Sequence, residues 1–198
     1  MAKKSQEKLF SDMPSLEVLE AELSRQKYRS RYGKVLRSTI YTLVTVAAIA
    51  VLVATLWLPV FQTSGSSMTP TLNENNFVVS VKSKKLQQGD IIAFYINNKI
   101  LVKRVIACAG DWVNISEDGI VSVNGEVLEE PYIDEPALGD TDLDYPYQVP
   151  EKRYFVMGDH RSISIDSRNT AVGCISDEDL VGKIVFCVWP VKDFGSIQ

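Results

Sequence analysis

Serines are concentrated in a short segment, residues 64–72, which also contains a glycine and a proline. A serine in such a segment is ordinarily a turn residue. Its hydroxyl can also attack a carbonyl carbon, provided that a neighbouring base removes the proton. Whether this segment is more than a turn therefore depends on a base supplied from elsewhere in the chain.

Lys103 is the candidate for that base, because it lies in an otherwise apolar segment, residues 100–106. In a strand, a lysine at this position risks having its ammonium group held against the interior. A lysine on the exposed edge of a sheet is the alternative interpretation. Arg104, the next residue, would point to the other face of such a strand. If Lys103 is buried, desolvation and a neighbouring arginine cation would both lower the pKa of its amine. A neutral lysine can then activate a serine without a histidine, as in a Ser-Lys dyad.

Metal and disulfide chemistry have little support in the sequence. The three cysteines, Cys108, Cys174 and Cys187, cannot all pair within the chain, so at most one internal disulfide can form. The chain has a single histidine and no Cys-x-x-Cys motif, which leaves a zinc site with few ligands. No metal or organic cofactor is expected.

Short strands are the elements that would position these residues. Beyond Pro70, runs of β-branched and aromatic residues alternate with turn residues, and no stretch sustains a long amphipathic helix. The expected strands are residues 77–81, 90–95, 100–106, 119–123, 154–157 and 183–189. The expected turns are at residues 97–98, 118–119, 124–125 and 158–159. The sequence therefore predicts a mainly β, antiparallel domain.

Residues 126–151 interrupt this pattern with nine acidic residues, no basic residue and four prolines. This composition predicts an extended excursion at the surface. We expect solvation to be its main role.

Residues 38–61 form a stretch of 24 residues without a charge. A helix of about 20 such residues crosses the hydrocarbon core of a bilayer, so we expect a transmembrane helix here. A buried core helix is the alternative. A cleaved signal peptide fits less well, because its apolar region is shorter and lies nearer to the N-terminus.

The charges beside this stretch predict its orientation. Six lysine or arginine residues lie between residues 25 and 37, and none follows the stretch until Lys82. We therefore expect residues 1–37 in the cytoplasm and residues 62–198 outside it, with Trp57 near the outer interface. Within the first segment, Pro14 could open a helix with Leu16, Leu19 and Leu23 on one face.

The overall charge argues against a nucleic-acid partner. The 198 residues carry a formal net charge of -4, and most of the excess acid lies after residue 37. An acidic domain lacks the basic face that phosphate binding requires.

Four segments in order resemble the type I signal peptidases, in the form with a single N-terminal anchor found in Gram-positive bacteria. They are SGSSMTPTL at residues 64–72, QGDII at 88–92, KRVIACAGD at 103–111 and GDHRSISIDSR at 158–168. The resemblance covers roughly residues 61–190. It implies an extracytoplasmic antiparallel β-sheet domain with the Ser-Lys protease fold of signal peptidases and repressor-type proteases.

The resemblance also assigns roles to residues. Ser67 matches the nucleophile and Lys103 the general base, while Ser164 matches the serine that helps to orient the lysine. Asp166 and Arg168 match a supporting pair, although a plain structural salt bridge would have the same sequence.

Further matches concern the substrate groove and the turn before the Ser-Ile-Asp-Ser-Arg element. Gly158 and Asp159 match that turn. The positions that correspond to the lining of the groove, where ordinary apolar packing is the alternative, are Met68, Leu72, Leu101 and Val102.

The chain departs from the family pattern at two positions. Gly65 stands where some relatives have a hydroxyl that donates to the oxyanion, so backbone N–H groups beginning with that of Ser67, with Ser66 or Ser64 reaching in, would have to serve. His160 stands where many relatives have asparagine. As the only histidine, it could complete a Ser-His-Asp triad with Ser67, or occupy a turn or surface position.

The resemblance implies a membrane-bound serine endopeptidase of the plasma membrane that removes signal peptides from exported preproteins after small residues. Its expected partners are these preproteins, the bilayer and the secretion translocon. Because Ser67 lies six positions after the end of the expected anchor at Phe61, the nucleophile is expected within roughly 20 Å of the membrane exit. The alternatives are a sortase-like transpeptidase that uses Cys174 or Cys187 with His160, and a non-catalytic, membrane-anchored binding module.

Overall fold

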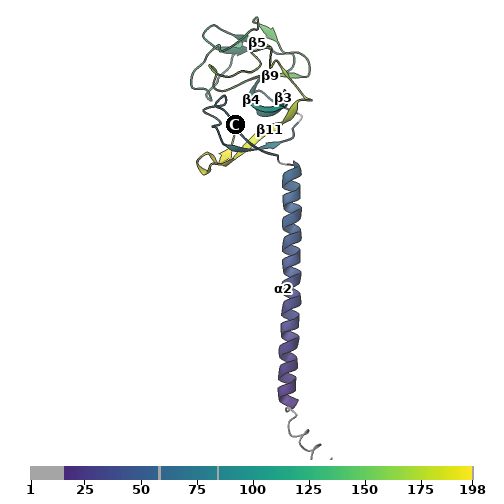
Figure 1. Cartoon of the computed structure of the whole chain (residues 1–198). Helices are drawn as coiled ribbons and strands as arrows, with labels where there is room; N and C mark the ends of the chain where they lie inside the picture. Colours follow the sequence, from purple (N-terminus) through teal and green to yellow (C-terminus); the bar gives the residue numbers. More distant parts are fainter. Residues whose placement is uncertain (1–15, 58, 84, 198) are drawn as a thin grey trace, which may run out of the picture. The chain divides into compact units, whose positions relative to one another are not determined.

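A computed structural model describes residues 16–57, 59–83 and 85–197 of the chain. The chain divides into two compact units, residues 1–52 and 53–198. The first unit holds most of one long helix, and the second holds the strands (Figure 1).

The helix α2 (Leu16–Trp57) is continuous from the described part of the expected cytoplasmic segment into most of the expected anchor. It ends before the boundary expected at residue 61, because Val60 and Phe61 lie in strand β1 (Val60–Gln62). Pro59 accounts for the early end, since proline lacks a backbone N–H and its ring excludes the preceding helical turn. Pro14, which was expected to open a helix, lies outside the described residues.

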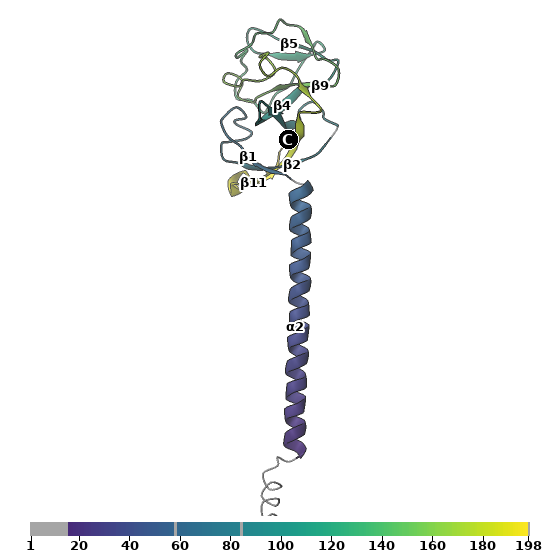
Figure 2. The same ribbon diagram turned by 45° about the vertical axis from the view of Figure 1, so that its right-hand side comes forward.

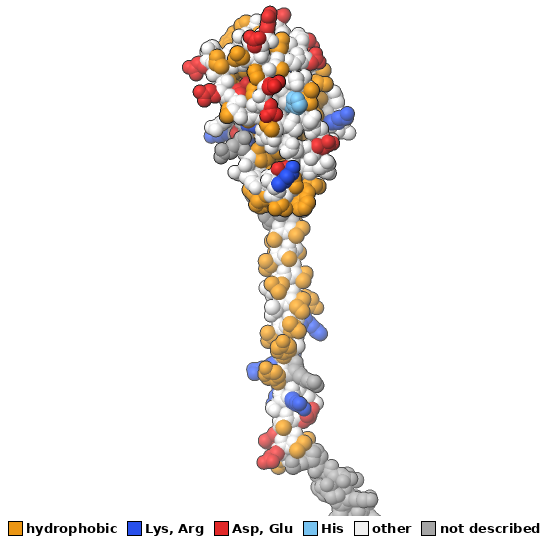
Figure 3. Space-filling model, turned by 90° about the vertical axis from the view of Figure 1, so that its left-hand side faces the viewer, with side chains coloured by type: hydrophobic (Ala, Val, Ile, Leu, Met, Phe, Trp, Pro, Cys, Tyr) orange, Lys and Arg blue, Asp and Glu red, His pale blue; other side chains and the backbone are white. Residues whose placement is uncertain are grey.

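The helix has the length and composition of a membrane span. Residues 16–52 contain a stretch that is apolar enough to cross a membrane, and none of this stretch is buried in the structure. Hydrophobic side chains surround one part of the helix, and lysine and arginine side chains lie toward its N-terminal part (Figure 3). Exposed leucines and valines in water would be unfavourable, so a lipid environment explains this surface better than solvent does.

The larger sheet has eight strands among the described residues, and all its pairs are antiparallel. Their order is β1-β2-β11-β3-β4-β9-β10, with β12 paired to β11. Besides β1, the strands are β2 (Phe77–Val81), β3 (Ile91–Ile96), β4 (Lys99–Ala107), β9 (Arg153–Met157), β10 (Ile175–Ser176), β11 (Leu180–Trp189) and β12 (Gly195–Ser196). Figure 2 shows β1 and β2 beside β11.

A smaller antiparallel sheet has the order β7-β6-β5-β8. Its strands are β5 (Trp112–Ile115), β6 (Val121–Val123), β7 (Glu126–Val127) and β8 (Tyr147–Gln148), and the short 3-10 helix η1 (Val191–Asp193) follows β11. Both ribbon views place β5 at the end of the unit opposite to β11 (Figures 1 and 2).

The prediction of a mainly antiparallel β domain is confirmed. Each of the six expected strands overlaps an observed one, and the β3–β4 hairpin turns at Asn97 and Asn98. Both asparagines have positive φ, 46° and 64°, as a two-residue hairpin of this kind requires. The strands that were not predicted have two to four residues, too few to show an alternating pattern.

The core consists of three apolar clusters. One of them contains Ile106, Val113 and Phe155, and so joins the two sheets. Another contains Met68 and Leu72, which anchor the segment that follows β1 on residues of β2, β3 and β11. Burial of a side chain of this size contributes about 1.5–3 kcal/mol, so the serine segment is held by packing rather than left free.

The acidic excursion is more than a solvated surface, contrary to expectation. It supplies β7 and β8 to the smaller sheet, and Val149 is buried in the first cluster. Leu138 and Leu143 pack against the same cluster. Its acidic composition hid these apolar residues, which are spaced irregularly and lie between prolines.

Gly182 in β11 tests how tightly the larger sheet is packed. A β-carbon at this position would lie 2.7 Å from the carbonyl oxygen of Val81, which cannot rotate away. Gly182→Ala should therefore lower the free energy of unfolding by about 1–3 kcal/mol. Gly195→Ala in β12, with open space around the added methyl, should leave it within about 0.5 kcal/mol of the wild type. Thermal unfolding of the two variants in detergent measures both, and equal stabilities would contradict the tight contact.

Candidate active site

Ser67 lies in the loop between β1 and β2. The base of this loop is closed by two backbone hydrogen bonds, from Thr63 N–H to the Asn76 carbonyl at 2.8 Å and from Asn75 N–H to the Thr63 carbonyl at 3.0 Å. The buried Asn76 side chain also donates to Asp193 Oδ2 at 2.9 Å. Together with the buried Met68, these contacts hold the serine loop at both its base and its middle.

Lys103 lies in the interior of β4, opposite Ile92 of β3. Only 3% of its surface is exposed, so the alternative of an edge lysine in solvent is wrong. Its Nζ donates to Ser164 Oγ at 2.9 Å. The structure thus brings together two of the residues that the sequence singled out.

The environment of Lys103 lowers the pKa of its amine from 10.5 to about 8. Desolvation is the largest cause, the nearby Arg168 cation acts in the same direction, and Asp166 and Asp159 act against them. The expected direction is confirmed, and the neighbouring arginine cation is that of Arg168. A neutral amine is therefore accessible near neutral pH.

Gly158 connects the serine loop with the partner of Lys103. A β-carbon on Gly158 would lie 2.2 Å from Ser164 Oγ and 2.5 Å from the Ser67 carbonyl oxygen, so both residues approach its α-carbon closely. The His160 N–H donates to the same Ser67 carbonyl at 3.1 Å. Within the described residues, no hydrogen bond joins the Ser67 hydroxyl directly to the Lys103 amine.

Asp166 and Arg168 form a fully buried ion pair, with Nε–Oδ1 at 2.8 Å and Nη2–Oδ2 at 2.9 Å. Asp166 also accepts the Gly158 N–H at 2.9 Å, and Arg168 Nη2 donates to the Ser164 carbonyl at 3.2 Å. The pair therefore fixes the backbone around Gly158 and Ser164 in addition to neutralising its own charges.

Arg104, beside Lys103 in β4, forms a second buried ion pair. Its Nε and Nη2 donate to the two oxygens of Asp159 at 2.9 and 2.8 Å. Thr71 donates to Asp159, and the ring of Tyr132 lies 3.8 Å from the Arg104 guanidinium carbon. Sequence reasoning missed Thr71 and Tyr132, because nothing in the local pattern marks either residue.

Arg161 and Glu130 form a third buried pair that sequence reasoning also missed. Arg161 Nη1 donates to Glu130 Oε2 at 2.8 Å. One signal was available: the excursion has nine acidic residues and no basic one, so any ion-pair partner had to come from another segment.

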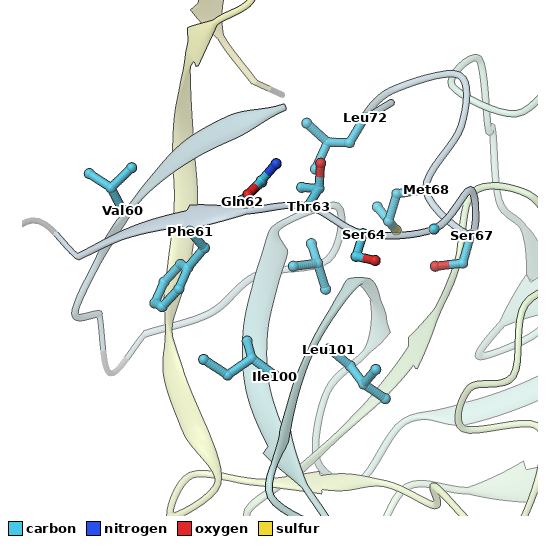
Figure 4. A pocket seen from close by; sticks show the side chains of 12 residues that line it. Val60, Phe61, Gln62, Thr63, Ser64, Ser67, Met68, Leu72, Ile100 and Leu101 are labelled. Carbon is cyan, nitrogen blue, oxygen red and sulfur yellow. The ribbon is translucent and has the colours of Figure 1, made fainter. Parts of the chain in front are cut away.

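A pocket of about 310 Å³ opens beside Ser67. Figure 4 shows the loop that carries Ser64 and Ser67 on one side and Ile100 and Leu101 of β4 on the other. The four residues expected to line a groove all line this pocket: Met68, Leu72, Leu101 and Val102. Ser64 lines it as well.

The residues of the alternative chemistries are arranged differently. His160 Nδ1 is bonded to Thr69 Oγ1 at 2.9 Å, which disfavours a triad with Ser67. All three cysteines are free, and burial raises the pKa of the Cys174 thiol. Cys187 Sγ is buried and bonded to the Trp189 carbonyl. These thiols lack the electropositive, accessible setting of a reactive cysteine.

Comparisons with known proteins identify the family of this chain. A family model described as signal peptidase, peptidase S26, matches residues 36–189. Signal peptidase IB of Staphylococcus aureus is 36% identical over 151 residues, which cover 66% of this chain and 77% of that protein. Signal peptidase I U of Bacillus subtilis is 30% identical over 177 residues, which cover 83% of this chain and 92% of that protein. A crystal structure of a signal peptidase I from Enterococcus faecalis is 31% identical and covers 50% of this chain and 97% of that one, with a TM-score of 0.41.

The family model and the two relatives show that the chain belongs to the signal peptidase family, peptidase S26. It is a type I signal peptidase, a serine hydrolase that cleaves signal peptides.

Proposed function

We propose that the chain removes signal peptides from exported preproteins with a dyad of Ser67 and Lys103. The observation that supports this most is the buried Lys103 amine, held at Ser164 next to the loop that carries Ser67. With its pKa lowered to about 8, this amine can accept the proton of a serine hydroxyl.

In the proposed reaction, Lys103 Nζ takes the Ser67 proton while Oγ attacks the carbonyl carbon of the scissile peptide. The lysine ammonium then gives this proton to the leaving amine, which releases the mature protein and leaves the signal peptide as an acyl-enzyme. A water molecule, deprotonated by the same amine, hydrolyses the ester. The direct contact between serine and lysine would form when substrate binds, because catalytic hydrogen bonds often tighten at that stage.

The oxyanion of the tetrahedral intermediate needs donors beside Ser67. The Ser67 N–H is available, since it has no acceptor among the described residues. Ser64 is the candidate for a second donor, because it lines the pocket and Ser66 does not. Gly65 lies between Ser64 and Ser66. Its φ of 85° is a backbone conformation that favours glycine.

The substrate would bind as an extended strand. β4 pairs with β3 from Lys99 to Arg104 but with β9 only from Arg104 onward, so in the described structure its other edge is unpaired near the pocket. An extended peptide can add to such an edge through main-chain hydrogen bonds. Alternate side chains of this peptide would point into the pocket, which favours small residues at the first and third positions before the cut.

The apolar part of α2 would anchor the chain in the plasma membrane. The basic residues before it favour a cytoplasmic N-terminus and an extracytoplasmic β unit. Preproteins whose own apolar segments lie in the same bilayer, delivered by the secretion translocon, would then meet the site at a high local concentration.

The dyad is tested by replacing each of its members in the full chain. Ser67→Ala and Lys103→Ala should each lower kcat by at least about 10³-fold, because nucleophile and base act as a unit. His160→Ala should stay within a few-fold of the wild type. Mass spectrometry of a secretory precursor incubated with each variant in detergent measures the cleaved fraction and locates the cut.

Wild-type turnover in Lys103→Ala would contradict the dyad, and loss of turnover in His160→Ala would favour a triad. If the wild-type protein cleaves no secretory precursor, the proposed reaction is wrong and the alternative of a non-catalytic binding module is favoured.

The pH dependence follows from the lowered pKa of Lys103. Only the neutral amine is active, so kcat/KM should rise about tenfold per pH unit below the pKa of about 8 and level off above it. Initial rates on a signal-peptide substrate between pH 6 and 10 measure this limb. A limb near the usual histidine pKa of about 6.5, or one that changes in His160→Ala, would contradict the assignment to Lys103.

Thiol alkylation separates the serine mechanism from a sortase-like one. Because Cys174 and Cys187 are buried and do not line the pocket, iodoacetamide should leave turnover unchanged. Complete inactivation of the folded protein would instead favour a cysteine nucleophile. Mass spectrometry of the treated protein shows which thiols were modified.

A further inference from the structure

The acidic excursion, residues 126–151, contacts all three of the buried arginines near the active site. Glu130 pairs with Arg161, and the Tyr132 ring packs against Arg104. The carbonyl group of Leu138 accepts a hydrogen bond from Arg168 Nη1 at 2.7 Å. Contacts with three buried arginines would not be expected of a segment that only solvates the surface.

Glu130 makes the most specific of these contacts. Only 7% of its side chain is exposed, and its carboxylate accepts hydrogen bonds from both terminal nitrogens of Arg161. The Tyr132 hydroxyl donates to the same carboxylate at 2.8 Å. A buried charge is tolerated when it is paired and hydrogen-bonded in this way.

Arg161 transmits this contact to Gly158. Its Nε donates to the Gly158 carbonyl at 3.0 Å, while Asp166 accepts the Gly158 N–H at 2.9 Å. Both the N–H and the carbonyl group of Gly158 are therefore hydrogen-bonded to buried charged side chains. Without Glu130, the Arg161 guanidinium would be buried and unpaired, and it would have to move to find water or another acceptor.

Gly158 in turn sets the spacing of the active site. It lies in close contact with both the Ser67 carbonyl and Ser164 Oγ, the acceptor of the Lys103 amine. A shift of this residue would change the distance between nucleophile and base. Misplacement by about 1 Å can cost as much as 10²-fold in rate.

We propose that Glu130 is a positioning residue for the catalytic dyad, acting through Arg161 and Gly158. The inference rests on the proposed function of Ser67 and Lys103. The groups whose charges act on Lys103 are Asp166, Arg168 and Asp159, and Glu130 is not among them. Removal of its charge therefore acts on the amine through position rather than through a direct electrostatic effect.

Glu130→Gln tests this role in the full chain, because glutamine keeps the shape but removes the charge and replaces one of the two acceptor oxygens that face Arg161 with an NH2 donor. Glu129→Gln is the matched control, since Glu129 is an adjacent, exposed carboxylate and its loss gives the same change in charge. For both variants we would measure kcat, KM, the pH profile of kcat/KM and the unfolding temperature in detergent.

We expect Glu130→Gln to lower kcat about 10-fold or more, with KM within about 2-fold of the wild type, because Glu130 does not line the pocket. The acid limb of kcat/KM should move to higher pH, because a looser Ser164 admits water to the amine and weakens the desolvation that lowers its pKa. Glu129→Gln should behave as the wild type in every measurement.

An unchanged kcat and acid limb in folded Glu130→Gln would overturn the inference, as would a loss of kcat that matches the unfolded fraction at the assay temperature.

If Glu130→Gln fails to fold, Tyr132→Phe gives the same test more mildly, because it removes one donor to Glu130. It should lower kcat and move the acid limb to higher pH, both to a smaller extent. Wild-type values for it would equally overturn the role. Ser67→Ala and Lys103→Ala, assayed in parallel, separate the two proposals: activity in either of them defeats the dyad itself.

Discussion

The exclusion of water from one lysine amine is the constraint on which the proposed chemistry of this protein depends. Two carboxylates near Lys103, those of Asp166 and Asp159, favour its charged form. Each of them is bound by a buried arginine, Arg168 or Arg104. Desolvation is the largest effect on the pKa of this amine, and the Arg168 cation acts in the same direction, so the amine can lose its proton near neutral pH.

Buried ion pairs add little net stability, because the cost of desolvating the charges is comparable to the attraction between them. In this domain their clearer effect is on geometry. Arg168 donates to the carbonyl groups of Arg161, Ser164 and Leu138, so a single guanidinium braces the segment 158–168 and joins it to the acidic excursion. Planar guanidinium groups with several fixed donors suit this task better than lysine ammonium groups do. The backbone around the site is therefore fixed by directional contacts rather than by apolar packing alone.

The sequence predicted the parts of this structure that depend on local pattern. β-branched runs predicted the long strands, and the asparagine pair at residues 97–98 predicted a hairpin. The apolar surroundings of Lys103 left its burial and an exposed edge position both open, and the four family motifs singled out Ser67, Lys103 and Ser164. The pairing of Glu130 with Arg161 could not be predicted in the same way, because it joins residues that are distant in the sequence and depends on the path of an irregular segment. The two-residue strands were missed for the same reason: their partners, rather than their own residues, determine them.

The unpaired edge of β4 is a demanding feature to maintain. An edge that accepts a passing peptide also offers its hydrogen-bonding groups to the edge of any other sheet, including that of a second copy. Here the open stretch runs only from Lys99 to Lys103 before β9 takes over the pairing, and it begins with an exposed lysine. A short edge that begins with a charged residue can pair with a single added strand. Edge-to-edge pairing of two whole sheets would require a longer, uncharged edge. Lengthening this unpaired stretch of β4, or removing the charge of Lys99, would therefore expose the protein to self-association.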